Sequence, residues 1–481
     1  MIFQAKKNGN MHKFLFLIII LVGISLVGIA DAKYVPEWIK NTAGWWSNDQ
    51  ISEQEFMNAI EFLIQNEVIK ITQESNYTKD YSDFDEIVND ETLSTTEKFV
   101  ITDKIYPKIS GYRGAAFDGE SVYYAPYYNN YGRSGTMIKY NIGMPFNDTK
   151  SWEVHEVGKY NFKGFQGALY NNNYVYYVPY YFDETKDPGS KLLRYNTELE
   201  FNNKNAWQVL FYLEAYEDGV IANDFVYFSP HLDYENKRNA NPLRYDSTKP
   251  FTESSSWERY ESGLKISYIG ASFDGRFVYY APFESEYENI TIILRYDTTK
   301  DFLQNDAWKQ IEIPYGQYSG TGFNGKNIVM APYCFIEKNG NKECSKILFL
   351  ESKTQEISYS DEIFGAYNGV IEANDVLYFV PHNDLDSKRS DFLRITDVIE
   401  TFSPSIAIGG YWGGVFDGRF VYYAPYDFPE TDIRNGEFLR FDTTLAFNDD
   451  ASWEIMRLYV TDFDYNFEFD DVKIEEFEKF R

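Results

Sequence analysis

The feature that most constrains this chain is a unit of about 50 residues that occurs seven times. Each copy opens with an aromatic or acidic residue, one variable residue and a glycine, and successive glycines lie 53, 52, 51, 50, 49 and 44 residues apart. A fixed period of this length indicates a repeat architecture in which every unit packs against its neighbours. The glycines are Gly114, Gly167, Gly219, Gly270, Gly320, Gly369 and Gly413.

Each copy continues with the same succession of elements. A turn such as Phe117-Asp118-Gly119 leads into a strand that ends in proline, and a third strand resembling Leu193-Arg194-Tyr195 follows. A fourth strand carries tryptophan in five of the copies. Four short strands per unit, rich in β-branched and aromatic residues, predict an all-β fold, a seven-bladed β-propeller of four-stranded blades over residues 98–481 with a C-terminal strand or tail. An open solenoid is the structural alternative.

Three details of the repeat predict local geometry. The Asp-Gly turns favour two-residue hairpins in which both central residues have positive φ. The repeated glycine fits an innermost strand where a Cβ atom would collide with the next blade. Eight segments compete for seven outer strand positions, so either a strand over 99–105 or the one that carries Trp453 is extra.

The N-terminal region has the pattern of an export signal. Lys6, Lys7 and Lys13 precede the apolar run 14–30, and the small residues Ala30 and Ala32 follow it. This pattern predicts a signal peptide over residues 1–32 and a secreted or cell-surface protein with no stable membrane insertion after cleavage. An uncleaved anchor is the alternative, although the run is shorter than the roughly 20 residues of a spanning helix.

Two further segments precede the repeats. A capping box at Ser52–Glu55 and apolar residues at helical spacing predict a helical hairpin over residues 33–71. Residues 72–97 contain eight acidic residues and one lysine, which is typical of a solvated acidic linker.

Two parts of the chain resemble known groups of proteins. The segment with Trp38, Trp45 and Trp46 resembles a module near the start of many exported proteins of ammonia-oxidising archaea, which implies an archaeal cell-surface setting. The blade pattern of Phe-Asp-Gly-Arg, Val-Tyr-Tyr-Ala-Pro and Leu-Arg-Tyr-Asp-Thr-Thr resembles repeats of exported, functionally uncharacterised bacterial and archaeal propeller proteins. This second resemblance implies a fold and no activity.

Charge and composition exclude several classes of function. The formal net charge of −29 disfavours binding to nucleic acid, because phosphates would be repelled. Four histidines and two cysteines are too few for a cysteine-rich zinc module, and the sequence predicts neither a metal centre nor a cofactor.

The two cysteines and three sequons suit an exported chain. Cys334 and Cys344 flank an Asn-Gly turn signal, so we expect a disulfide that joins the two strands of a hairpin. A reactive thiol pair is the alternative, but a close Cys-x-x-Cys spacing is missing. Candidate glycosylation sites are Asn76, Asn147 and Asn289.

The candidate ligand site follows from the lengths of the loops. In each copy 12 to 15 residues separate the strand-ending proline from the third strand, and long loops on one face mark the functional side of a propeller. The centre of that face is expected to carry the variable residue before each repeated glycine: Arg113, Gln166, Asp218, Ile269, Ser319, Asn368 and Trp412. Around it we expect the residue after each proline: Tyr127, Tyr180, His231, Phe283, Tyr333, His382 and Tyr426.

A ring of aromatic residues with scattered polar groups suits a neutral, sugar-like or peptide ligand. The sequence therefore favours a module that binds a glycan, a peptide or a cell-surface protein through its long-loop face. One alternative is an extracellular hydrolase or lyase that uses acidic residues in the axial pocket, and another is a structural component of the envelope. No catalytic residue can be singled out, because no Gly-x-Ser-x-Gly motif is present and there are too many acidic residues to choose a catalytic pair.

Overall fold

A computed structural model describes residues 107–459 except for 158–161, 181–189, 213, 234–236, 288, 338–339, 384–387 and 430, together with residues 474–475. The predicted signal peptide, helical hairpin, acidic linker and 99–105 strand lie outside the described residues, as does Asn76. In the part of the chain that is described, no helix is long and apolar enough to cross a membrane.

The repeats form seven four-stranded antiparallel sheets, which we call blades one to seven in chain order. Blade one contains β1 (Tyr112–Phe117), β2 (Ser121–Pro126), β5 (Thr136–Asn141) and β6 (Trp152–Glu156). Blade two contains β7 (Phe165–Asn171), β8 (Tyr174–Pro179), β9 (Ser190–Asn196) and β10 (Trp207–Tyr212). Blade three contains β11 (Ala215–Ala222), β12 (Phe225–Leu232), β13 (Leu243–Asp246) and β14 (Trp257–Arg259).

The remaining blades repeat the order. Blade four contains β15 (Ile266–Phe273), β16 (Phe277–Ser285), β17 (Ile290–Asp297) and β18 (Trp308–Pro314). Blade five contains β19 (Tyr318–Phe323), β20 (Asn327–Pro332), β23 (Leu348–Glu351) and β24 (Ile357–Tyr359). Blade six contains β25 (Tyr367–Ala373), β26 (Val376–Pro381), β27 (Phe392–Ile395) and β28 (Ile399–Phe402). Blade seven contains β29 (Gly410–Phe416), β30 (Phe420–Asp427), β31 (Glu437–Asp442) and β32 (Trp453–Arg457).

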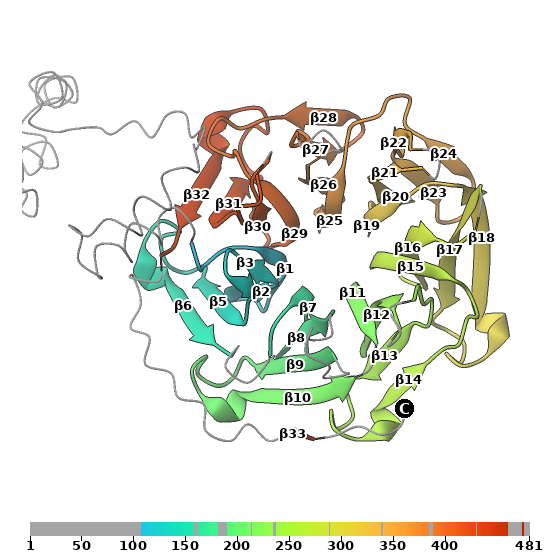
Figure 1. Cartoon of the computed structure of the whole chain (residues 1–481), viewed down its shortest axis with the longest axis horizontal. Coiled ribbons are helices and arrows are strands. Elements are labelled where there is room, and N and C mark those ends of the chain that lie inside the picture. The colour runs from blue at the N-terminus through green and yellow to red at the C-terminus, as the bar shows by residue number, and fades with distance from the viewer. Residues whose placement is uncertain are drawn as a thin grey trace, which may run out of the picture. The chain divides into compact units, whose positions relative to one another are not determined.

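The blades are arranged around a central axis, and the first strand of each lies innermost (Figure 1). Each innermost strand contacts the innermost strands of both neighbouring blades, and β1 contacts β29, so the ring is closed. The fold is therefore the predicted seven-bladed propeller, and the open solenoid is excluded. β6 and β32 are the fourth strands of their own blades, which means that closure uses no exchanged strand.

Both faces of each blade are buried, which explains the dense aromatic content. Along β2, Val122 and Tyr124 pack in the cluster shared with blade seven, whereas Tyr123 and Ala125 pack in the cluster shared with blade two. Successive side chains of a strand point to opposite faces, so both registers must be apolar. Each of the seven hydrophobic clusters lies between two adjacent blades.

The repeated glycines lie where adjacent blades approach most closely. A Cβ atom on Gly320 would lie 2.5 Å from the Cα of Gly369, and one on Gly413 would lie 2.8 Å from the Cα of Gly114. Both Gly320 and Gly413 also have positive φ, at 106° and 65°. The expectation that a Cβ would collide at the axis is confirmed at these positions.

The two-residue prediction for the Asp-Gly turns is wrong. Three residues, 118–120, separate β1 from β2, and of these only Gly119 has positive φ. Oδ1 of Asp118 accepts hydrogen bonds from the backbone N–H groups of Glu120 and Ser121, at 2.8 and 2.7 Å. Because the aspartate side chain satisfies these donors, its own backbone does not need the left-handed conformation.

Two short additions decorate the blades. In blade one, β3 (Tyr128–Asn129) and β4 (Gly132–Arg133) form a small hairpin in the loop after β2. β33 (Ile474–Glu475) pairs in parallel with the outer edge of β10. The C-terminal segment therefore adds a fifth strand to blade two.

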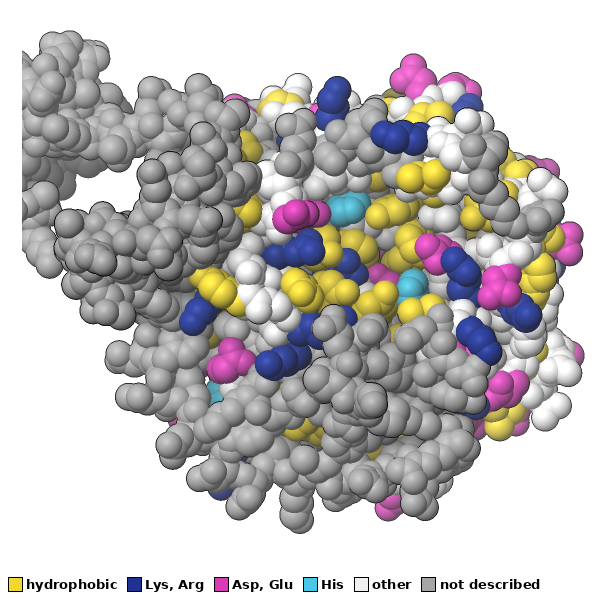
Figure 2. All heavy atoms as spheres, in the orientation of Figure 1, with side chains coloured by type: hydrophobic (Ala, Val, Ile, Leu, Met, Phe, Trp, Pro, Cys, Tyr) yellow, Lys and Arg dark blue, Asp and Glu magenta, His cyan; other side chains and the backbone are white. Residues whose placement is uncertain are grey.

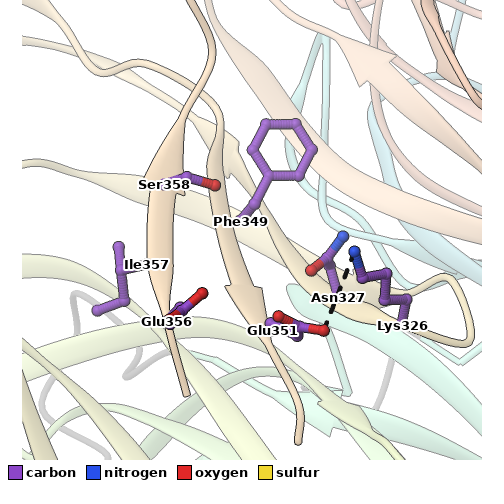
Figure 3. Close-up of a pocket in the computed structure, with 7 residues that line it drawn as sticks. All are labelled: Lys326, Asn327, Phe349, Glu351, Glu356, Ile357 and Ser358. Carbon is purple, nitrogen blue, oxygen red and sulfur yellow. Dashed lines mark ion pairs between the residues drawn. The ribbon is translucent and has the colours of Figure 1, made fainter. Parts of the chain in front are cut away.

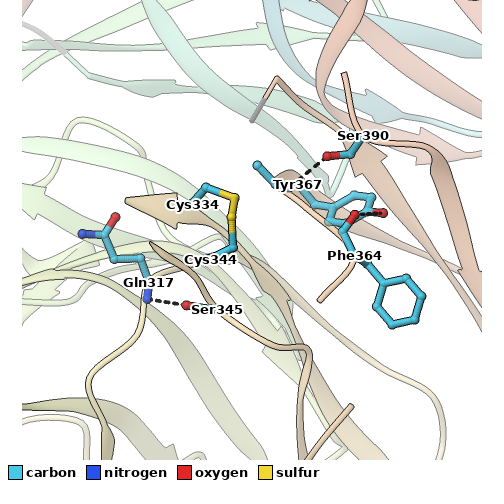
Figure 4. Close-up of a disulfide and its surroundings, with 8 residues drawn as sticks. Gln317, Cys334, Cys344, Ser345, Phe364, Tyr367 and Ser390 are labelled. Atoms are coloured by element: carbon cyan, nitrogen blue, oxygen red, sulfur yellow. Dashed lines mark hydrogen bonds between the residues drawn. A yellow bond between two sulfur atoms is a disulfide. The ribbon is translucent and has the colours of Figure 1, made fainter. Parts of the chain in front are cut away.

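The expected disulfide between Cys334 and Cys344 is present (Figure 4). The cysteines lie opposite each other in a hairpin of β21 (Cys334–Ile336) and β22 (Lys342–Cys344). This hairpin belongs to the loop between β20 and β23, so it stands on the long-loop side of blade five.

Candidate ligand-binding site

The residues that follow the strand-ending prolines form a closed ring of aromatic side chains, which we call the rim. Each rim residue contacts the next around the axis, with ring centroids 5.1 to 6.3 Å apart. In Figure 2, histidine, basic and hydrophobic side chains gather near the middle of the ring. The members of the rim are Tyr127, Tyr180, His231, Phe283, Tyr333, His382 and Tyr426.

Next to the rim lies a second set of residues, which we call the axial tier. It consists of the residue that precedes the glycine position of each innermost strand. Six of the residues named from the sequence hold this position: Arg113, Gln166, Ile269, Ser319, Asn368 and Trp412. Contacts between different blades bring several of them together, since Arg113 contacts Gln166 and Trp412, and the Ser319 hydroxyl donates to Asn368 Oδ1 at 3.0 Å.

The seventh member is Glu217, and the predicted Asp218 is one position too late. In blade three Tyr216 pairs with Pro230, as Tyr112 pairs with Pro126 in blade one. Asp218 therefore occupies the glycine position, where it adopts a φ of 60° and lies against Gly167. Aspartate tolerates this left-handed conformation better than most residues. The sequence itself indicates that Asp218 holds the glycine position, because Pro230 lies 12 residues after Asp218 and the same spacing separates glycine from proline in the other copies.

Arg113 is the hub of the site. Its guanidinium carbon lies 3.4, 4.0 and 4.4 Å from the ring centroids of Trp412, Tyr127 and Tyr426. Nη2 donates to the Tyr426 hydroxyl at 2.6 Å, and Nη1 donates to Oε1 of Gln166. Although burial lowers it, the pKa of Arg113 is raised overall by Tyr426, Tyr127 and Glu217. The axis therefore carries a permanent positive charge on a side chain that is 8% exposed.

Glu217 forms a chain with two rim residues. Its Oε1 lies 3.6 Å from Nη1 of Arg113, and its Oε2 lies 3.3 Å from Nδ1 of His231. The other ring nitrogen of His231 lies 3.4 Å from the Tyr180 hydroxyl. Burial raises the pKa of Glu217 to about 8, against the lowering effect of Arg113. Burial, with the charge of Arg113, lowers the pKa of His231 to about 3, so the imidazole is neutral near pH 7.

The opposite histidine has different neighbours. His382 stacks on Tyr333 with a centroid distance of 5.9 Å and contacts Trp412 edge-on at 5.5 Å. Its Nδ1 lies 4.0 Å from Oδ1 of Asp427. Burial lowers its pKa, although Asp427 opposes the shift. Phe283 and Tyr333 separate the two histidines along one side of the rim, so they do not form a pair.

Several buried polar atoms of the site have no hydrogen-bond partner among the described residues. They belong to axial-tier and rim residues, and donors are prominent among them. Buried polar groups are nearly always paired in folded proteins, so such atoms indicate a site for water or ligand. They are Arg113 Nε, Gln166 Nε2, Asn368 Nδ2, Glu217 Oε1, His231 Nδ1 and His382 Nδ1.

Other singled-out residues lie away from the axis. His155 is buried in β6, where it stacks on Trp207 between blades one and two. Three of the arginines in the third strands form ion pairs with a glutamate on the fourth strand: Arg244 with Glu258, Arg394 with Glu400 and Arg440 with Glu454, at 2.5 to 2.9 Å. Asn147 and Asn289 are exposed.

A separate cleft of about 580 Å³ lies in blade five, on the second to fourth strands (Figure 3). Ile357 lines it at the position that tryptophan holds in five other blades, since Ile357 pairs with Leu350 as Trp152 pairs with Tyr140. An ion pair between Lys326 and Glu351, at 3.9 Å, lies at one end. The cleft is built from one blade alone and has no part in the axial site.

No group of three or more histidine, cysteine, aspartate or glutamate residues within the described ranges is arranged to hold a metal ion. The axial tier and the rim offer one guanidinium, one carboxyl group, two imidazoles, amides, hydroxyls and aromatic rings, and Asp427 and Arg434 lie against the rim residues His382 and Tyr426.

Comparisons with known proteins do not identify a family for this chain. No protein-family model matches the chain, and no curated protein sequence matches it. Among solved structures, the one titled "Structure of YjhT" is similar with a TM-score of 0.44 at 11% identity, and the match covers 62% of this chain and 99% of that one. A similarity at this level carries no argument about ligand or activity.

Proposed function

We propose that the propeller binds a glycan at the axial mouth of its long-loop face. The observation that carries this proposal is the unbroken rim of seven aromatic rings around a polar tier. Sugar rings stack their C–H faces on aromatic side chains and need convergent polar groups for their hydroxyls. Both requirements meet at this mouth, because Tyr127 and Tyr426 of the rim directly contact Arg113 of the tier.

We further propose that the protein is exported and acts at the cell surface. Support comes from the signal-like segment over residues 1–32 and from the disulfide-bonded hairpin beside the rim. Disulfides persist mainly in oxidising compartments outside the cytosol.

The proposed function is tested with the purified full chain on a glycan array. A double variant, Tyr127→Ala with Tyr180→Ala, removes adjacent stacking surfaces and is expected to lower affinity at least tenfold, because each aromatic stacking contact is worth on the order of 1 kcal/mol. Tyr359→Ala is the matched control, since this tyrosine is 38% exposed on the outer strand β24. Binding that survives the double variant, or binding of peptides and no glycans, would contradict the proposal.

A second candidate function is proton-transfer catalysis on the same ligand. The proximity of Glu217, His231 and Tyr180 favours it, because a carboxyl group, an imidazole and a hydroxyl that lie 3.3 and 3.4 Å apart are groups used together in general acid–base catalysis. Mass analysis of the array hits after incubation with the protein separates the two functions. A binding module leaves the glycans intact, whereas a lyase or hydrolase shortens them.

A further inference from the structure

We propose that the axial tier is a carboxylate-binding subsite, so that the ligand is an acidic glycan whose uronate group lies against Arg113. This inference rests on the proposed function and adds to it the charge of the sugar. Three independent features of the tier support it.

The first feature is the guanidinium itself. Arg113 is nine-tenths buried, and its planar group is fixed between Trp412, Tyr127 and Tyr426. Its Nε has no hydrogen-bond partner among the described residues. A guanidinium binds carboxylates through parallel N–H donors, and one that aromatic rings already hold in place loses little entropy on binding. A buried cation at the axis is also notable because the whole chain has a net charge of −29.

The second feature is the excess of amide donors in the axial tier. Gln166 and Asn368 are both about 1% exposed, and the amide nitrogen of each is unpartnered within the described ranges. Their oxygens are already used, by Arg113 and by the Ser319 hydroxyl. An unpaired buried donor is costly, and a carboxylate offers about four acceptor positions. Gln166 Nε2, Asn368 Nδ2 and Arg113 Nε are therefore three buried donors for which an acidic ligand would bring acceptors.

The third feature is that the one carboxyl group of the tier does not cancel the charge of Arg113 near neutral pH. Burial raises the pKa of Glu217 to about 8, so this group keeps its proton at pH 7. The charged or titratable groups that act on it are Arg113, Asp218, Glu284 and His231. Burial raises the pKa of Asp218 to about 6, and His231 is neutral. Ionisation of Glu217 above pH 8 is expected to weaken the binding of an anion.

The test compares an oligosaccharide of uronate residues with the same oligosaccharide after methyl esterification, by calorimetric titration of the full chain. We expect the acid form to bind at least tenfold more tightly. Arg113→Gln is expected to remove this preference, and Arg113→Lys, which keeps the charge but loses the planar fork, to retain part of it. Arg276→Gln is the matched control, because it removes the same positive charge from an arginine in an exposed turn. Thermal unfolding checks that each variant is folded. If Arg113→Gln does not fold, the comparison of acid and ester forms is made with Arg113→Lys instead.

The pH dependence supplies a second readout. Affinity of the wild-type chain for the acid form is expected to fall about tenfold between pH 7 and pH 9, above the pKa of Asp218, whereas that of Glu217→Gln changes much less. Equal affinity for the acid and ester forms, with Arg113→Gln unchanged, would overturn the carboxylate subsite and leave glycan binding intact. Failure of both sugars to bind would overturn the proposed function itself. Binding of an acidic peptide in place of the sugar would overturn the assignment of the ligand class.

Discussion

Glu217 is a carboxyl group that the fold removes almost entirely from water. It stands between a guanidinium and an imidazole, yet neither contact is a well-formed hydrogen bond, since the distances are 3.6 and 3.3 Å. Desolvation disfavours the charged form of an acid, and here it outweighs the attraction of Arg113. The contribution of Glu217 to the free energy of unfolding therefore falls as the pH rises, whereas an uncharged side chain in its place would make a contribution that does not depend on pH.

Replacement of Glu217 by glutamine is expected to remove a pH-dependent loss of stability. The pKa of Glu217 is raised from 4.5 to about 8 in the folded chain, so between these values the folded state holds a proton that the unfolded state has lost. The free energy of unfolding therefore falls as the pH rises through this range. Relative to wild type, Glu217→Gln is expected to gain about 2–4 kcal/mol between pH 5 and pH 8. Urea unfolding at several pH values measures it, and a difference independent of pH would contradict the assignment.

The residues of the site were largely predictable from spacing, and the exception is instructive. Gly219 attracts attention as the repeated glycine of copy three, but the spacing to Pro230 identifies Asp218. Two adjacent residues that both tolerate positive φ make the choice ambiguous unless a second landmark is used. The contacts of Arg113 with blades two, three and seven could not be predicted, because they depend on the radius of the ring and on side-chain conformation.

At the scale of elements, the disulfide hairpin is joined directly to the rim. Tyr333 precedes Cys334, and its backbone N–H donates to the carbonyl of Gln317 while its carbonyl accepts from Ser345, both at 3.0 Å. The backbone N–H of Gln317 donates to Ser345 Oγ at 2.9 Å (Figure 4). The hairpin of β21 and β22 therefore fixes the backbone that carries one rim residue.

Removal of the disulfide is expected to lower the stability of the whole blade. Cross-linking two residues that are 10 apart restricts the unfolded chain by about 2–3 kcal/mol. Urea unfolding of the wild type in the presence of a thiol reductant should match that of the Cys334→Ser, Cys344→Ser double variant without it. The double variant itself should not respond to the reductant. An unchanged midpoint in both cases would mean that the hairpin is ordered without its cross-link and does not take part in global unfolding.

The strand order within a blade was predictable, whereas the turn geometry was not. Continuous apolar runs and the strand-ending prolines define β2 and its equivalents, because burial on both faces requires apolar residues at successive positions. The Asp-Gly turns were misassigned because the aspartate side chain makes hydrogen bonds that sequence pattern alone does not specify. The third donor to this aspartate is the hydroxyl of Tyr123, at 2.7 Å.

On the scale of the whole molecule, the same arginine contact recurs between blades and also closes the ring. Arg244 of blade three stacks on Phe302 of blade four at 4.5 Å and donates to the Tyr296 hydroxyl at 3.1 Å. Arg440 of blade seven makes the equivalent contacts with Phe146 and the Tyr140 hydroxyl of blade one, at 4.5 and 3.2 Å. The two interfaces are chemically matched, but they differ in covalent connection.

That difference predicts where the ring opens first. Blades three and four are joined by the short segment 260–265, whereas blades seven and one are held together by non-covalent contacts across their interface. Arg244→Met and Arg440→Met each remove a cation–π contact and hydrogen bonds but keep the aliphatic stem, so each should lower the free energy of unfolding by about 1–3 kcal/mol.

Hydrogen exchange should distinguish the two variants. In Arg440→Met the amides of β1 and β29 are expected to exchange faster than in wild type, because separation of blades seven and one is not limited by a connecting segment. In Arg244→Met the amides of β11 and β15 should be affected less, since the connection keeps these blades at high effective concentration. Equal acceleration at both interfaces would show that the ring unfolds only as a whole.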